Sequence, residues 1–153
     1  MDLRNRVNQA LKQAMKDKDS RRLATLRLIN AAIKDQDIAL RGQGNEDGVS
    51  DTDILAILAK MTKQRQESAR AYEEGGRIDL AEQERTEISI IEDFLPRQLD
   101  EEEITKAIED AIAQTGAETL RDMGKVMAHL KGGYAGQMDF GAVGPRVKDQ
   151  LSG

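Results

Sequence analysis

The chain has 153 residues, enough for one domain or two small ones, and 33% of them are charged with a net charge of −5. Its 39% hydrophobic content is typical of a soluble globular protein rather than a disordered chain. There is no cysteine, which excludes disulfides and thiol chemistry, and no apolar run approaches the roughly 20 residues of a membrane span. We therefore expect a cytoplasmic protein that does not enter a membrane.

Helical spacing dominates the N-terminal part of the chain. Apolar residues recur every four positions in a first helix at about 2–16, where Leu3, Val7, Leu11 and Met15 form a stripe that Ala10 and Ala14 widen. A second helix follows at about 21–40, with either Asp19 or Ser20 as its cap. Either Ser50 or Asp51 caps a third helix that stops at Gly75 and Gly76, and a fourth helix at about 78–94 ends at Pro96.

Three shorter helices are predicted after a linker at 96–99. Asp100, with Glu103 three residues later, opens the fifth helix, and Gly116 closes it. Thr119 is the expected cap of a sixth helix that carries Leu120, Met123, Met127 and Leu130 on its core side. Gly132, Gly133 and Gly136 are expected to form a flexible connector. Either Asp139 caps the last helix, or that helix starts later with Pro145 in its first turn.

These patterns predict an all-α fold in two parts. A four-helix domain occupies residues 1–95, and a three-helix tail domain occupies residues 96–153. The smaller part is close to the size limit for independent folding, so it is either marginally stable or packed against a neighbour.

Groups that could perform catalysis are almost absent from the sequence. The single histidine, His129, is interpreted as an ordinary helix-surface residue, and one histidine without cysteine cannot form the usual zinc sites. No phosphate-binding glycine motif is present. We predict no catalytic residue, no metal site and no cofactor.

Charge is unevenly distributed despite the negative total. Residues 1–41 hold 10 lysines and arginines against 5 acids, and residues 121–150 hold 5 against 3. Local basic patches can contact RNA while the overall negative charge suppresses loose binding, although solvated helix faces also explain such patches. Gly124, before Lys125, allows either close approach of a partner backbone or helix–helix packing.

Three segments resemble the GatB/YqeY family. They are Leu-Arg-Leu-Ile-Asn-Ala-Ala-Ile-Lys at 26–34, Glu-Ile-Ser-Ile-Ile-Glu-Asp-Phe-Leu-Pro-Arg-Gln-Leu at 87–99 and Asp-Met-Gly-Lys-Val-Met at 122–127. The resemblance implies two α-helical parts. It also implies a stand-alone relative of the C-terminal tail of the B subunit of glutamine-dependent aminoacyl-tRNA amidotransferase, a carbon–nitrogen ligase. In that subunit the tail contacts tRNA and the amide transfer takes place in another domain.

The resemblance implies a tRNA-associated module without independent catalysis. The residues expected to contact phosphates or to allow close approach of the RNA backbone are Gly124, Lys125, Lys131, Gly136, Arg146 and Lys148. One departure stands in the turn before the last helix, where Gln137 replaces the charged residue common in the family. Two alternatives remain. One is a helical adaptor that binds an aminoacyl-tRNA synthetase or an amidotransferase component through the polar third helix or the first two basic helices, and the other is an enzyme that acts on an amide or a carboxylate.

Overall fold

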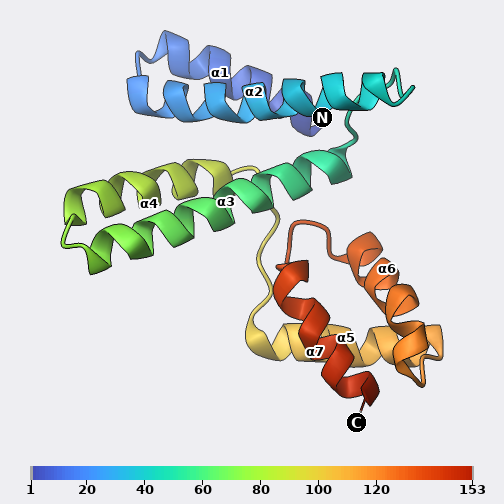
Figure 1. Cartoon of the computed structure of the whole chain (residues 1–153). Helices are drawn as coiled ribbons and strands as arrows, with labels where there is room; N and C mark the ends of the chain where they lie inside the picture. Colours follow the sequence, from blue (N-terminus) through green and yellow to red (C-terminus); the bar gives the residue numbers. More distant parts are fainter. Residues whose placement is uncertain (1, 153) are drawn as a thin grey trace. The chain divides into compact units, whose positions relative to one another are not determined.

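A computed structural model describes residues 2–152, and within that range the secondary structure is entirely helical (Figure 1). Seven α-helices and one short 3₁₀ helix are formed in the described residues, which confirms the predicted all-α fold. In chain order they are α1 (Leu3–Lys16), α2 (Ser20–Gly42), α3 (Asp51–Glu74), α4 (Ile78–Glu92), α5 (Glu101–Thr115), η1 (Leu120–Asp122), α6 (Met123–Gly133) and α7 (Phe140–Ser152).

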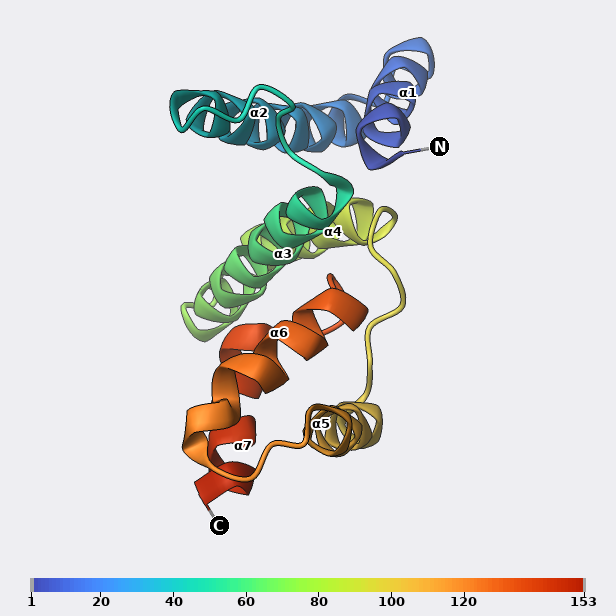
Figure 2. The same cartoon turned by 90° about the vertical axis from the view of Figure 1, so that its right-hand side faces the viewer.

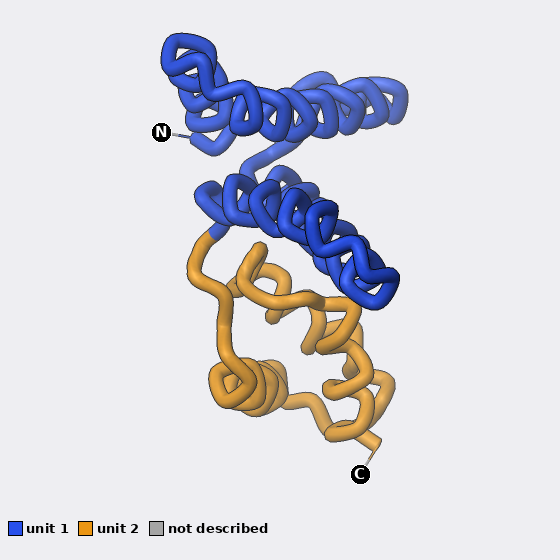
Figure 3. The backbone as a smooth tube through the Cα atoms, turned by 90° about the vertical axis from the view of Figure 1, so that its left-hand side faces the viewer, with its two compact units in different colours: residues 1–95 blue, residues 96–153 orange. Residues whose placement is uncertain are grey.

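The chain divides into two compact units, residues 1–95 and residues 96–153 (Figure 3). Each unit has its own hydrophobic core. In the N-terminal unit α1 packs on α2 and α3 packs on α4 (Figure 1). In the C-terminal unit α6 packs against both α5 and α7 (Figure 2). Each unit therefore presents surface helices that are supported by its own core.

Local capping chemistry explains where the helices begin. The carboxylate of Asp19, not the hydroxyl of Ser20, accepts the backbone N–H of Arg22 and caps α2. Ser50 caps α3 in a reciprocal capping box with Asp53, and Asp100 caps α5 in the same way with Glu103, as the spacing of the latter pair predicted. These caps satisfy backbone donors that the first turn of a helix leaves free.

The core of the N-terminal unit is built from aliphatic side chains of all four helices, and Leu26, Ile29, Ile54, Leu58 and Ile91 are fully buried. One sequence expectation is wrong here. Met15 is 48% exposed, whereas Ala14, which was expected to widen the same stripe, is buried.

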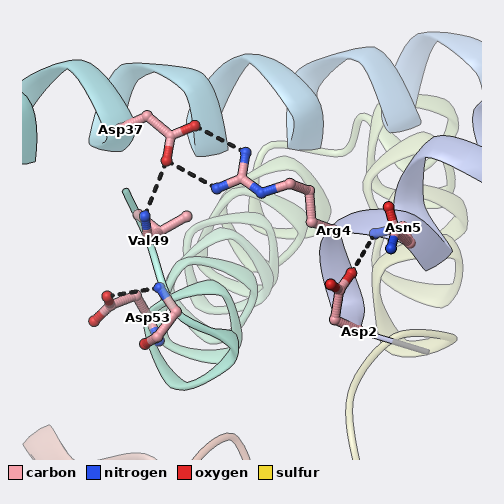
Figure 4. A network of polar contacts seen from close by, with 7 residues as sticks. Asp2, Arg4, Asn5, Asp37, Val49 and Asp53 are labelled. Atoms are coloured by element: carbon pink, nitrogen blue, oxygen red, sulfur yellow. Dashed lines mark hydrogen bonds and ion pairs between the residues drawn. The ribbon is translucent and has the colours of Figure 1, made fainter. Parts of the chain in front are cut away.

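A polar clamp joins α1, α2 and the loop before α3 (Figure 4). Both terminal nitrogens of Arg4 donate to the carboxylate of Asp37 at 2.8 Å, and the backbone N–H of Val49 donates to the same carboxylate at 2.9 Å. Gly48 lies directly against this carboxylate, because a Cβ atom at that position would be 2.5 Å from Asp37 Oδ1. The clamp fixes the C-terminal half of α2 from its inner side.

The C-terminal unit differs from the sequence prediction around α6. The 3₁₀ turn η1 precedes the helix, and Leu120, which was expected to face the core, is 46% exposed. Gly132 and Gly133 were expected in a flexible connector but belong to the last turn of α6. Of the two expected starts of the last helix, the structure forms the one at Asp139: α7 begins at Phe140, and the Asp139 carboxylate accepts the backbone N–H of Gly141 at 3.0 Å. Pro145 lies inside α7 rather than in its first turn, so the helix continues past a residue that has no N–H to donate.

Candidate nucleic-acid interface

The core contacts of α6 determine which of its side chains reach the surface. Val126 and Leu130 are fully buried, so Gly124, Lys125 and Lys131 lie on exposed positions. Lys131 forms no ion pair with any residue between 2 and 152. The Lys125 side chain is 63% exposed, and its Nζ lies 3.4 Å from Asp122 Oδ1. The outer face of α6 therefore presents two cations to solvent.

Asp122 organises the start of this helix. Its carboxylate accepts the backbone N–H groups of Glu118 at 2.9 Å and Thr119 at 3.3 Å. These two hydrogen bonds, with the nearby Lys125 ammonium, lower the pKa of Asp122 below its usual value. Asp122 is consequently anionic at neutral pH, and it holds Lys125 near the N-terminus of α6.

Small residues share the outer face of α6 with the lysines. Gly124, Ala128 and Gly132 recur every four residues, and all three are exposed. A Cβ atom added at Gly124 or Gly132 would meet nothing within 4 Å. Packing inside the chain therefore does not require glycine at either position, and the helix–helix packing interpretation of Gly124 finds no partner among the described residues.

Arg146 has partners inside the protein. Its Nη1 lies 2.9 Å from Glu101 Oε2 and its Nη2 donates to Thr105 Oγ1 at 2.7 Å, so it joins α7 to α5. The side chain remains 33% exposed. Lys148, on the same helix, is exposed and pairs with no acid in the described part of the chain.

Gly136 is buried, unlike Gly124. Its φ of 76° is in the left-handed region that favours glycine, and its carbonyl accepts the Gln98 side-chain amide. The carbonyl of the next residue, Gln137, accepts the backbone N–H of Leu99 at 3.0 Å. The turn before α7 therefore needs glycine for its own conformation, and a contact between Gly136 and a partner stays a prediction that the structure does not require.

The remaining polar groups do not form a recognisable catalytic arrangement. His129 is exposed on α6, as predicted. Across residues 2–152 no group of three or more histidine, cysteine or acidic side chains is arranged to hold a metal ion.

The sequence analysis named most of this surface but missed Ala128. The signal was available, because Gly124, Ala128 and Gly132 have the four-residue spacing of one helix face. It also could not identify the partners of Arg146, because Glu101 is 45 residues away in the chain.

The YqeY-like protein family matches residues 4–151, nearly the whole chain. This protein belongs to that family. Its predicted membership is confirmed, and family membership accounts for the helical motifs and their order.

Curated relatives of this YqeY-like protein include fungal proteins named "Altered inheritance of mitochondria protein 41, mitochondrial". The protein from Clavispora lusitaniae is 38% identical over 97 residues, which cover 60% of this chain and 52% of the relative. The one from Saccharomyces cerevisiae strain YJM789 is 26% identical over 125 residues, covering 78% of this chain and 65% of the relative. The matches span about half to two thirds of these relatives.

The names of these relatives describe them as mitochondrial, so the predicted cytoplasmic location is not confirmed. Among the described residues, no helix is both long enough and apolar enough to pass through a bilayer.

Proposed function

We propose that this YqeY-like protein binds tRNA through the outer faces of α6 and α7. The observation that carries the proposal is the outer face of α6. There two exposed lysines flank the small residues Gly124, Ala128 and Gly132, and packing inside the chain does not require glycine at 124 or 132. A phosphate backbone can approach such a face closely and meet an ammonium group there. Lys125, Lys131 and Lys148 are the proposed phosphate contacts, and Arg146 contributes from its exposed part.

Recognition of this kind depends on the shape of the RNA rather than on its base sequence. The surface offers point charges on a helix and no aromatic side chain at the proposed contacts for stacking on bases. The net charge of −5 disfavours nonspecific binding elsewhere on the molecule. The proposed ligand is therefore folded tRNA, held by its backbone.

The proposal includes no catalytic step in this chain. The resemblance to the tail of the amidotransferase B subunit suggests that chemistry on the bound tRNA belongs to a partner, either an amidotransferase component or an aminoacyl-tRNA synthetase. A cytoplasmic location is part of the proposal.

The test is a titration of the full chain with total tRNA at several salt concentrations. The variant Lys125→Glu/Lys131→Glu should bind tRNA about ten-fold more weakly. The slope of log affinity against log salt should become shallower by the amount that about two phosphate contacts contribute. Both side chains are exposed, so the fold should survive, which circular dichroism checks.

A matched control changes the same number of charges elsewhere. Lys12 and Lys16 are exposed on α1, and Lys12→Glu/Lys16→Glu should retain most of the tRNA affinity. If the two double variants lose affinity equally, binding depends on net charge only and the assigned surface is wrong. If a folded Lys125→Glu/Lys131→Glu variant binds like the parent at every salt concentration, the tRNA proposal fails.

A helical adaptor that binds another protein is the second candidate function. The observation that favours it lies in the N-terminal unit, where α2 exposes large apolar side chains on the side opposite its core.

A further inference from the structure

Helix α2 has a second apolar face that its own core does not use. Leu26, Ile29 and Ile33 point into the core and are fully buried. On the opposite side Ala24, Leu28, Ala31 and Ile38 are all exposed, Leu28 by 48% and Ile38 by 67%. We call these four residues the α2 ridge. Apolar side chains gathered on one exposed face of this 23-residue helix make the ridge a candidate interaction surface.

The ridge has the spacing of a coiled-coil seam. With Asp35 included between Ala31 and Ile38, the positions alternate in steps of four and three residues, and Gly42 continues the series. Arg27, Lys34 and Arg41 recur every seven residues along one edge of the ridge, and we call them the basic row. All three are exposed, and none forms an ion pair with a residue between 2 and 152. In a coiled coil, residues beside the seam choose the partner by charge.

The opposite edge of the ridge borders a groove. A cavity of about 500 Å³ lies between α2 and α3, lined by Ala32, Asp35 and Gln36 from α2 and by Asp53, Ala56, Ile57, Lys60, Met61 and Gln64 from α3. The two alanines leave room for a helix to approach, and Lys60 adds a cation beside it. The basic row and Lys60 therefore lie on either side of the path that a docked helix would follow.

We propose that the α2 ridge docks an amphipathic helix of a partner protein whose flanks are acidic. The apolar seam of that helix would cover Leu28 and Ile38, its acidic flank would pair with the basic row, and one lysine or arginine in its seam would meet Asp35. This inference deepens the adaptor function and does not depend on the tRNA contact at α6 and α7.

A second copy of this chain fits the ridge poorly. A parallel pair of α2 helices would set Asp35 against Asp35 in the seam, and an antiparallel pair would set the two basic rows against each other. Nucleic acid also fits poorly, because it offers no apolar surface for Leu28 and Ile38. Charge complementarity thus favours an acidic helix.

The probe is a synthetic amphipathic peptide of about three heptads, with leucine in the seam, one lysine to face Asp35 and glutamate on both flanks. A twin peptide carries lysine in place of every flank glutamate. Fluorescence anisotropy with the full chain should show that the acidic peptide binds about ten-fold more tightly than its twin. Leu28→Gln/Ile38→Gln should weaken binding of the acidic peptide by a similar factor.

Charge reversal of the basic row supplies the decisive comparison. Arg27→Glu/Lys34→Glu/Arg41→Glu should reverse the preference, so that the basic twin binds better. The matched control Lys12→Glu/Lys16→Glu/Lys106→Glu alters three exposed lysines that belong neither to the ridge nor to the basic row and should keep the original preference.

Three results would overturn the proposal. The first is an unchanged preference in the reversed variant, and the second is a concentration-dependent dimer in sedimentation that Leu28→Gln abolishes, which would make a second copy the occupant. The third is loss of tRNA binding in the basic-row variant with unchanged peptide preference, which would assign the row to RNA. Failure of tRNA binding in Lys125→Glu/Lys131→Glu is measured separately and leaves this inference intact.

Discussion

The outer faces of α2 and α6 both carry cations that the fold leaves exposed, but the residues between those cations differ. On α2 they include leucine and isoleucine, whereas on α6 they are glycine and alanine. Large apolar side chains gain free energy only when another apolar surface covers them. Small ones gain little from burial, but they let a charged backbone come close to the helix. Exposed cations can therefore bind an acidic protein helix on α2 and an RNA backbone on α6.

The two faces are also held in place differently. The Asp37 clamp fixes α2 from its inner side, and of the basic row only Arg41 interacts electrostatically with Asp37 among residues 2–152. On α6 one of the exposed lysines itself contacts the helix start, through Asp122. Substitutions on the α2 surface should thus leave its fold unchanged, while Lys125 has a small structural role besides its proposed function.

The largest expected effect is a difference in stability between substitutions on the two apolar faces of α2. Leu26→Ala should destabilise the protein by about 3 kcal/mol, because it opens a cavity at a fully buried site. Leu28→Ala should change the free energy of unfolding by less than about 0.5 kcal/mol, because that side chain is already half exposed. Urea unfolding of both variants checks the pair. A large loss with Leu28→Ala would show that the ridge belongs to the core, and the comparison between α2 and α6 would collapse.

The next effect concerns the clamp that holds α2. Gly48→Ala should cost about 2 kcal/mol, because the new methyl group would displace the Asp37 carboxylate at a residue with φ of 79°. Gly44 is the matched control: its φ is also positive, at 90°, but an added Cβ meets nothing within 4 Å. Gly44→Ala should cost only about 1 kcal/mol. If urea unfolding shows equal losses of stability for the two variants, the contact with Asp37 does not add to the destabilisation by Gly48→Ala.

Acid should weaken the same clamp. The hydrogen bonds from Arg4 and then from the Val49 N–H lower the pKa of Asp37 from 3.8 to about 2. Because the pKa is lower in the folded protein, the stabilisation is complete above pH 3.8 and is lost as the pH falls toward 2. Solvent screening at the partly exposed Arg4 limits its size to about 1 kcal/mol.

Asp37→Asn isolates this contribution. The variant should be less stable than the parent at pH 6, and the difference should shrink at pH 3 and below, as measured by urea unfolding. A difference that stays constant across this range would mean that the charge of Asp37 does not stabilise the fold.

Sequence periodicity predicted the helices well because each helix here buries one regular stripe. The capping pair Asp100 and Glu103 was readable for the same reason, since its chemistry is local. Leu120 was misassigned because a 3₁₀ turn before α6 shifts the register, and glycine content alone placed Gly132 and Gly133 outside a helix that includes them.

Contacts between residues far apart in the sequence limit how much of the candidate site the sequence can predict. The positions of Lys125 and Lys131 followed from helical spacing, but the engagement of Arg146 by Glu101 and the burial of Gly136 depend on tertiary packing. The α2 ridge was also missed. A search for one apolar stripe per helix stops at Leu26, Ile29 and Ile33, and the second stripe on the opposite side becomes informative only when exposure is known.

The smallest expected effect tests why α6 carries Gly124. Alanine is a better helix former than glycine, and an added Cβ at this position meets no atom within 4 Å. Gly124→Ala should therefore stabilise the protein by about 0.5 kcal/mol in urea unfolding. If glycine is present for close approach of the RNA backbone, the same variant should bind tRNA a few-fold more weakly, because the methyl group separates the phosphates from Lys125.

The two measurements together distinguish the possible reasons for this glycine. A more stable protein with weaker tRNA binding supports the proposed role of the small residues on α6. A more stable protein with unchanged tRNA binding would show that Gly124 does not contribute to the interface, and the proposed contact would then reduce to the lysines alone. A loss of stability would show instead that the glycine is needed by the fold, and the contrast between the small-residue face of α6 and the ridge of α2 would lose its functional meaning.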